Sequence, residues 1–266
     1  MKLQLKFGLI LSTISLLTFI SYAKAETKVV ASIKPIHSLI SYVMDGVGTP
    51  GLLVDGSSSP HTFQLKPSHA TMLQEADIVF WIGEDLESFL ETPLESIAKD
   101  AKQVTLMESE DIEMLKFREK NVFDDHDDHG DEHDDHDEHG DEHDEHEEHE
   151  EHGDEHDEHE DEHDDHAHHD GHNHGEFDIH FWLDPEIAKT IVQIAAKEIS
   201  EIDPANASKY EANAAKALNK LDQLINDTRG KINKDATYVV FHDAFQYFEQ
   251  RFGIEVIGAL TVNPEI

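Results

Sequence analysis

Histidine dominates one stretch of this sequence. Between Asp124 and His174 it recurs every three or four residues among carboxylates, and the stretch holds seventeen of the chain's 22 histidines and 28 of its 59 acidic residues. No Lys or Arg occurs between Lys120 and Lys189. Imidazole binds borderline divalent cations near neutral pH, and carboxylates add oxygen ligands. The run therefore predicts divalent metal binding, because a merely solvated acidic linker would not need the histidines.

Every histidine of this run is a candidate low-affinity metal ligand. A segment so polar, with charge of one sign, cannot bury a hydrophobic core, so we expect disorder in the metal-free state. The candidates are His126, His129, His133, His136, His139, His143, His146, His149, His152, His156, His159, His163, His166, His168, His169, His172 and His174.

Five histidines lie outside the run, and three of them share a context. His61, His180 and His242 each occur at the end of a predicted strand or in the loop after one. Ligand sites in open α/β sheets gather at the carboxyl ends of the strands, so these three could converge on one cleft. Sequence spacing alone does not establish that. His37 and His69 fall in the first turns of predicted helices, and we interpret them as structural.

The elements that must position these residues alternate between strand and helix. This alternation predicts βαβ units with a parallel sheet, interrupted by the histidine-rich run as a surface insertion. The expected strands are 28–33, 52–54, 77–83, 103–107, 238–241 and 254–260, and the expected helices begin near Pro35, Pro67, Glu84, Pro185, Pro204 and Phe245.

One predicted helix is much longer than the others. Pro204 to Arg229 spans roughly 39 Å at 1.5 Å per residue and carries a single narrow apolar stripe, which suits a strut between two lobes. The strand–helix pattern after it continues to Ile266, so we expect an incomplete second lobe.

Composition excludes several classes of protein. The formal charge of −39 and the absence of a basic surface argue against nucleic-acid binding. Without cysteine there are neither disulfides nor thiolate metal sites. Lys2 and Lys6, the apolar stretch 7–20 and the Ala23–Ala25 cleavage signal predict a secretory signal peptide cut after Ala25. We expect a soluble periplasmic protein with no membrane anchor.

Three motifs carry a resemblance to a known family. They are Ser59–Ser68 (SPHTFQLKPS), His180–Pro185 (HFWLDP) and Phe241–Phe248 (FHDAFQYF). In this order they resemble the metal-binding receptors of ABC import systems for zinc and manganese. The likeness runs over residues 29–266. The stretch Gly258–Glu265 is similar to the stretch that follows the third motif in the zinc-binding members of this family.

The resemblance implies two lobes with parallel sheets, joined by one long helix, with one metal in the cleft between them. His61 and His180 would come from the first lobe and His242 from the second. The fourth ligand stays open, with water as the default. The organisation expected is a signal peptide at 1–25, a first lobe at 26–203 with the insertion at 124–174, a linking helix at 204–231, and the start of a second lobe at 232–266.

The function implied is that of a periplasmic receptor, a monomer and not an enzyme. It would capture Zn²⁺ and deliver it to an ABC permease, with the histidine-rich run collecting zinc. Three imidazoles and a water suit tetrahedral zinc, whereas manganese prefers more oxygen ligands. The alternatives are a manganese receptor, a metal-storage or buffering protein, and a zinc hydrolase that uses Asp243 or Glu84 as its general base.

Overall fold

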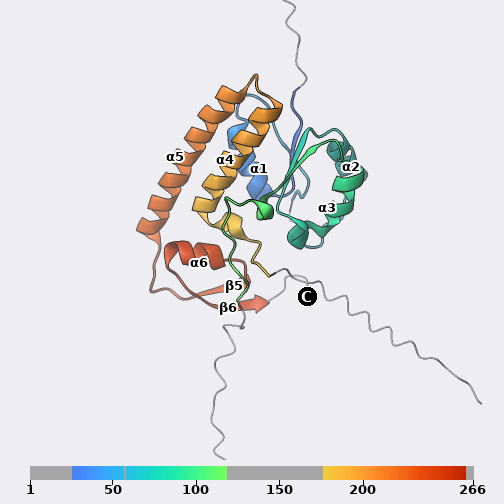
Figure 1. The fold of residues 1–266 in the computed structure, drawn as a ribbon. Coiled ribbons are helices and arrows are strands. Elements are labelled where there is room, and N and C mark those ends of the chain that lie inside the picture. Colours follow the sequence, from blue (N-terminus) through green and yellow to red (C-terminus); the bar gives the residue numbers. More distant parts are fainter. Residues whose placement is uncertain (1–25, 57, 119–175, 262–266) are drawn as a thin grey trace, which may run out of the picture.

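The computed structural model describes residues 26–56, 58–118 and 176–261 (Figure 1). The predicted signal peptide and the histidine-rich run at 124–174 lie outside the described residues. Among the helices that are described, none is both long enough and apolar enough to cross a bilayer.

The first lobe is built on a four-stranded parallel sheet. Its strand order is β2-β1-β3-β4, with β1 at Val29–Ala31, β2 at Gly51–Leu52, β3 at Ile78–Trp81 and β4 at Lys102–Thr105. All residues of β1 and β3 are buried, as expected where helices cover both faces of a parallel sheet.

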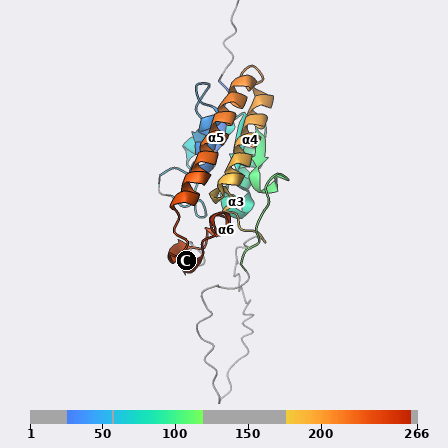
Figure 2. The same ribbon diagram turned by 90° about the vertical axis from the view of Figure 1, so that its left-hand side faces the viewer.

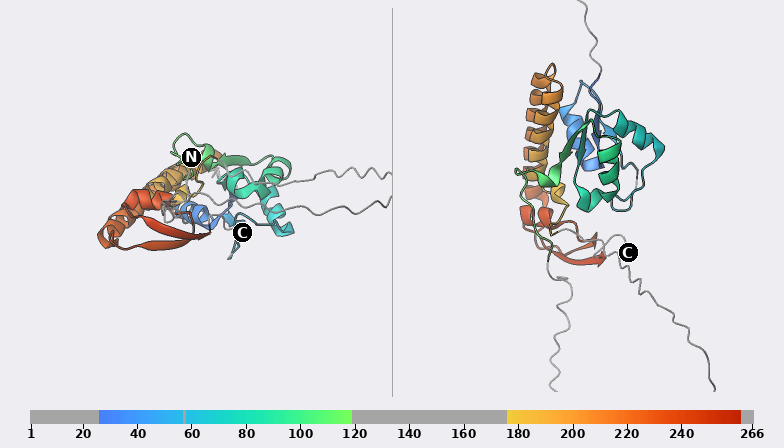
Figure 3. Two further views of the ribbon diagram at one scale, coloured as in Figure 1. Left: turned by 90° about the horizontal axis from the view of Figure 1, so that it is seen from below. Right: turned by 45° about the vertical axis from the view of Figure 1, so that its right-hand side comes forward.

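Alternate residues of the central strands pack into two separate hydrophobic cores. Ile78 and Phe80 of β3 belong to one core, whereas Val79 and Trp81 belong to the other, because successive side chains of a strand point to opposite faces. Figure 3 shows the two layers of helices on either side of the sheet. The first layer holds α1 (Lys34–Val43), α4 (Pro185–Ile202) and α5 (Ala207–Lys231), and the second holds α2 (Pro67–Gln74) and α3 (Glu84–Ser96).

A second βαβ unit follows α5. Strands β5 (Tyr238–His242) and β6 (Val256–Thr261) pair in parallel, and α6 (Gln246–Phe252) connects them. Helix α6 ends at Phe252 and is followed by Gly253, whose φ of 63° is the left-handed conformation that favours glycine at the end of a helix. The unit lies beyond the ends of α4 and α5 in Figure 1. The predicted class, α/β with parallel strands in two lobes joined by one long helix, is confirmed.

The long helix begins later than predicted. Helix α5 starts at Ala207, because the turn Asp203–Asn206 separates it from α4. The carboxylate of Asp203 accepts hydrogen bonds from Asn206 Nδ2 and the Tyr210 hydroxyl at 2.7 and 2.9 Å, so it holds the turn instead of capping a helix at Pro204. Figure 2 shows α5 running beside α4, with which it packs, before leading into the second lobe.

Other element ends differ from the sequence prediction by one or two residues, the usual uncertainty for helix and strand ends. The strand expected at 103–107 ends at Thr105, and Leu106–Glu108 forms the 3₁₀ helix η1. The strand expected at 52–54 is limited to Gly51–Leu52, although Leu53 N still donates to Ala31 O of β1.

Candidate metal centre

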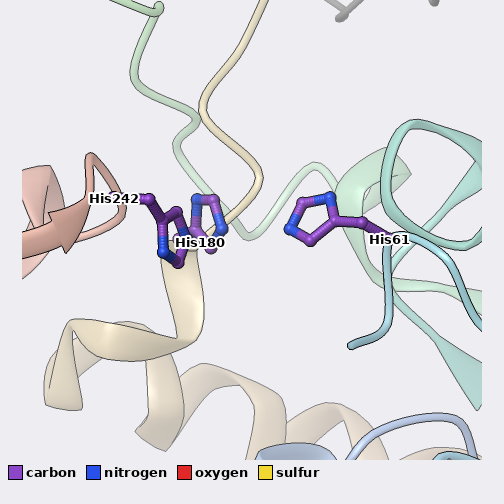
Figure 4. Close-up of side chains that lie close together, drawn as sticks. All are labelled: His61, His180 and His242. Carbon is purple, nitrogen blue, oxygen red and sulfur yellow. The ribbon is translucent and has the colours of Figure 1, made fainter. Parts of the chain in front are cut away.

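Three imidazole rings converge at the junction of the two lobes. His61, His180 and His242 each offer a ring nitrogen, and these nitrogens all lie within 4.8 Å of one another (Figure 4). The ring centroids are 5.3 Å apart for His180 and His242, and 5.9 and 6.3 Å apart for the pairs that include His61. Within the ranges that the structure describes, no Asp or Glu joins this group.

His61 lies in the irregular segment between β2 and α2. The prediction that it would follow a strand is met only loosely, because β2 ends at Leu52, well before it. The main-chain N–H of His61 donates to Ser59 Oγ at 3.2 Å. Binding residues often lie on loops that a rigid scaffold positions, and His61 is on such a loop.

His180 does not follow a strand of either sheet. It is the N-cap residue of the short 3₁₀ helix η2 (Phe181–Leu183), and its side chain is buried. The carboxylate of Asp178 accepts from both the main-chain N–H and Nδ1 of His180, at 3.0 and 2.8 Å. With Nδ1–H donated to Asp178, the lone pair on Nε2 is left for a cation.

His242 is the last residue of β5, as the sequence predicted. Its Nε2 atom is buried and has no hydrogen-bond partner among the described residues. Burial lowers the pKa of His242, and the nearby His180 lowers it further. A lowered pKa favours the neutral imidazole, which is the form that binds a metal ion.

The acid next to His242 lies close to a cation. Arg118 Nη2 lies 3.6 Å from Asp243 Oδ1 and 2.7 Å from Glu249 Oε1. Burial raises the pKa of Asp243, and the Arg118 guanidinium opposes that shift. Glu84, the other acid considered as a general base, is exposed in the first turn of α3.

The two remaining histidines outside the run bind the main chain. His37 Nε2 lies 3.0 Å from the carbonyl oxygen of Pro50, and His69 Nδ1 accepts from Lys66 N at 3.1 Å. Neither belongs to the group of three, in agreement with their interpretation as structural.

Sequence reasoning missed the polar residues that support the three rings. Asp178, Tyr247 and Arg251 connect the segment around His180 to α6 by hydrogen bonds and an ion pair. The signal that could have identified Asp178 is its position two residues before a candidate ligand. Tyr247 and Arg251 had no such signal, because their partners are far away in the sequence.

Comparison with known proteins supplies independent information. The family described as "Zinc-uptake complex component A periplasmic" matches residues 29–266. The "High-affinity zinc uptake system protein ZnuA" of Brucella abortus (strain 2308) is 46% identical over 247 residues, which cover 92% of this chain and 70% of that protein.

Solved structures show the same fold. A Zn(II)-bound variant of AdcAII from Streptococcus pneumoniae matches with a TM-score of 0.61 and 21% identity, over 90% of this chain and 71% of that one. A Mn-bound periplasmic metal-binding protein from Candidatus Liberibacter asiaticus matches with a TM-score of 0.58 and 18% identity, over 87% of this chain and 68% of that one.

Proposed function

The chain belongs to the ZnuA family of periplasmic zinc-uptake components, and we propose that it captures Zn²⁺ between its lobes for delivery to an ABC permease. The observation that carries the proposal is the convergence of His61, His180 and His242, which come from both lobes. Tetrahedral zinc with Zn–N distances of about 2.0–2.1 Å places its nitrogen ligands roughly 3.3 Å apart. Small side-chain movements would bring nitrogens within 4.8 Å of one another to that spacing.

The donor set favours zinc over manganese. Three imidazoles with water in the fourth position suit a four-coordinate borderline cation, whereas Mn²⁺ prefers more oxygen ligands. Within the described residues the group of potential ligands contains only nitrogen donors. This argument supports Zn²⁺ as the cargo although one structural neighbour carries manganese.

The hydrolase alternative has no acid within the group of three histidines in the described part of the chain. Asp243 is paired with Arg118, and Glu84 is exposed on α3. Members of this family are binding components of an uptake system, so the chain is a receptor and not an enzyme.

The remaining parts of the proposal concern the signal peptide, the assembly state and the histidine-rich run. We propose cleavage of the signal peptide after Ala25, a monomeric mature protein in the periplasm, and weak collection of zinc by the run at 124–174. The many histidines of that run would bind several zinc ions weakly and exchange them quickly. This would raise the local zinc concentration near the cleft.

The test is a zinc titration of the mature chain against a competing chelator. Substoichiometric zinc fills the tightest site first, so the cleft is measured before the run. His61→Ala, His180→Ala and His242→Ala should each abolish the tight site. His37→Ala is the matched control, because its ring binds Pro50 O and lies outside the group of three.

A tight site that survives all three substitutions would overturn the proposal, and so would an equal loss in His37→Ala. If cells that carry His61→Ala with the run intact fail to grow on limiting zinc, the function is not merely storage or buffering of zinc. A mature chain that prefers Mn²⁺ in the same titration would make the manganese receptor the better assignment.

A further inference from the structure

The ring of His180 is fixed by a buried carboxylate two residues before it. Asp178 is 1% exposed, and its Oδ1 atom accepts both from the main-chain N–H and from Nδ1 of His180. Two hydrogen bonds to one acceptor set both the rotation of the ring and its tautomer. Carboxylate partners of this kind orient metal-binding histidines.

Asp178 in turn belongs to a pair of antiparallel segments that flank the insertion. Its N–H donates to Leu115 O at 2.8 Å, and Lys116 and Phe177 form the adjacent bridge. In a regular ladder the N–H of Leu115 would donate back to the carbonyl oxygen of Asp178. Here a third group occupies that position.

The group is the hydroxyl of Tyr247, from α6 of the second lobe. It donates to the main-chain oxygen of Asp178 at 2.6 Å and accepts from Leu115 N at 2.8 Å. Tyr247 is 2% exposed, and burial raises its pKa to about 12, so the hydroxyl keeps its proton. One side chain of the second lobe thus completes the hydrogen bonding of the segment that holds His180.

We propose that Asp178 is a positioning residue for His180, and that Tyr247 makes this positioning depend on contact between the lobes. The inference rests on the proposed function. It gives the second lobe two routes to the metal, a direct one through His242 and an indirect one through Tyr247. Separation of the lobes would remove both the His242 ligand and the Tyr247 hydroxyl. The main-chain oxygen of Asp178 and the N–H of Leu115 would then lose these hydrogen bonds, and the His180 ring would be held less firmly as zinc leaves.

The experiment measures zinc affinity and zinc release rate in the mature chain. The test substitutions are Tyr247→Phe, Asp178→Ala and Asp178→Asn. An Asn side chain retains an oxygen that accepts hydrogen bonds, so it should restore positioning without the charge. The release rate is followed after addition of excess chelator, and the melting temperature is recorded for each variant without metal.

Matched controls come from a second buried tyrosine–aspartate pair. Tyr210 donates to Asp203 Oδ2 at 2.9 Å, and both residues are buried. They lie at the turn between α4 and α5, whereas η2 and His180 precede the other end of α4. Tyr210→Phe and Asp203→Ala therefore remove equivalent groups at a distance from the metal centre.

We expect Asp178→Ala to weaken zinc binding about 10–100-fold, the range seen for outer partners of metal-binding histidines. Asp178→Asn should recover most of this loss. Tyr247→Phe removes the two hydrogen bonds of the hydroxyl, which act on His180 only through the main chain, so it should weaken binding about 3–10-fold and should speed release. Its effect should shrink in the Asp178→Ala background, since both residues act through His180.

The controls should lower the melting temperature while leaving affinity and release unchanged. If Tyr247→Phe and Asp178→Ala change affinity no more than the controls do, the inference is wrong. If Asp178→Asn fails to rescue, the residue acts through its charge and not as a positioning group. A native chain without a tight zinc site would instead contradict the proposed function.

Discussion

Arg251 of α6 and Asp184 of the first lobe form a two-pronged ion pair. Arg251 Nε donates to Asp184 Oδ1 and Nη2 donates to Oδ2, both at 2.7 Å. Asp184 is also the N-cap residue of α4, where it accepts from Glu186 N at 2.9 Å. A fork of this kind is among the strongest side-chain hydrogen-bond geometries. It holds α6 against the end of α4 that is nearest to the three histidines.

We expect Arg251→Ala to lower the free energy of unfolding by about 1–3 kcal/mol. The substitution leaves the buried carboxylate of Asp184 without its cation, and partial exposure of Arg251 reduces the cost below that of a fully buried pair. Arg251→Lys should recover only part of the loss, because one ammonium group cannot make both bonds. Urea denaturation followed by circular dichroism measures the effect. Arg229→Ala, at an exposed position of α5, is the control, and equal midpoints for the two Ala variants would contradict the prediction.

Trp182 should report zinc binding by its fluorescence. Its ring centroid lies 5.4 Å from that of His180, whereas the chain's other tryptophan, Trp81, packs in the second core and donates to Thr105 Oγ1 of β4 at 3.0 Å. A cation on His180 changes the charge beside the Trp182 indole, so emission should change on zinc addition. Trp182→Phe should abolish this response and Trp81→Phe should retain it. The reverse pattern would show that zinc binds elsewhere.

The fold was largely predictable because its signals are local. Short continuous apolar runs identified β1 and β3, and the Asp184–Pro185 pair identified the start of α4. The long helix was misplaced at its start because Asp203–Pro204 is the same signal, yet the Asp203 side chain binds Tyr210 instead. Such competition between partners cannot be read from a dipeptide.

The site was predictable only in part for a related physical reason. The three histidines stood out by residue type and by their place after predicted strands. The residues that orient them did not, because Tyr247 and Asp178 are 69 positions apart and become partners only in three dimensions. Hydrogen bonds between residues far apart in the chain produce no periodic pattern in the sequence, so they cannot be predicted from it.

Glu87 predicts an unusual dependence of stability on pH. Its side chain is fully buried, and one oxygen accepts from Ile82 N and Gly83 N at 2.7 and 3.3 Å. Burial raises the pKa to about 7 from an ordinary value of 4.5, against the opposing effect of its hydrogen bonds. The folded chain therefore binds a proton more tightly than the unfolded chain. Stability should fall as pH rises from about 4.5 to 7, by on the order of 3 kcal/mol, and then level off.

The contribution of Glu87 is isolated by difference. Glu87→Gln cannot titrate, so the free energy of unfolding of the native chain minus that of the variant should decline across this window and be flat above it. Chemical denaturation of metal-free protein at several pH values provides the data. Glu84→Gln, on the exposed first turn of the same helix, should leave the slope unchanged. A difference that rises with pH would show that the buried carboxylate is stabilised as the anion.

Removal of Asp124–His174 should leave the fold and the tight site intact. The flanking segments remain held together by the Lys116–Phe177 bridge and by Phe117 N, which donates to Glu176 O at 3.2 Å. A short glycine-containing turn can close the gap, because a shorter loop costs less entropy to close. The expected zinc stoichiometry is one per chain, against several for the full chain, with affinity at the cleft changed less than about twofold. Equilibrium dialysis with metal analysis measures the stoichiometry, and chelator competition measures the affinity. If the shortened chain retains several zinc ions, collection by the run is wrong; if the cleft loses its affinity, the run and the cleft are not separate sites.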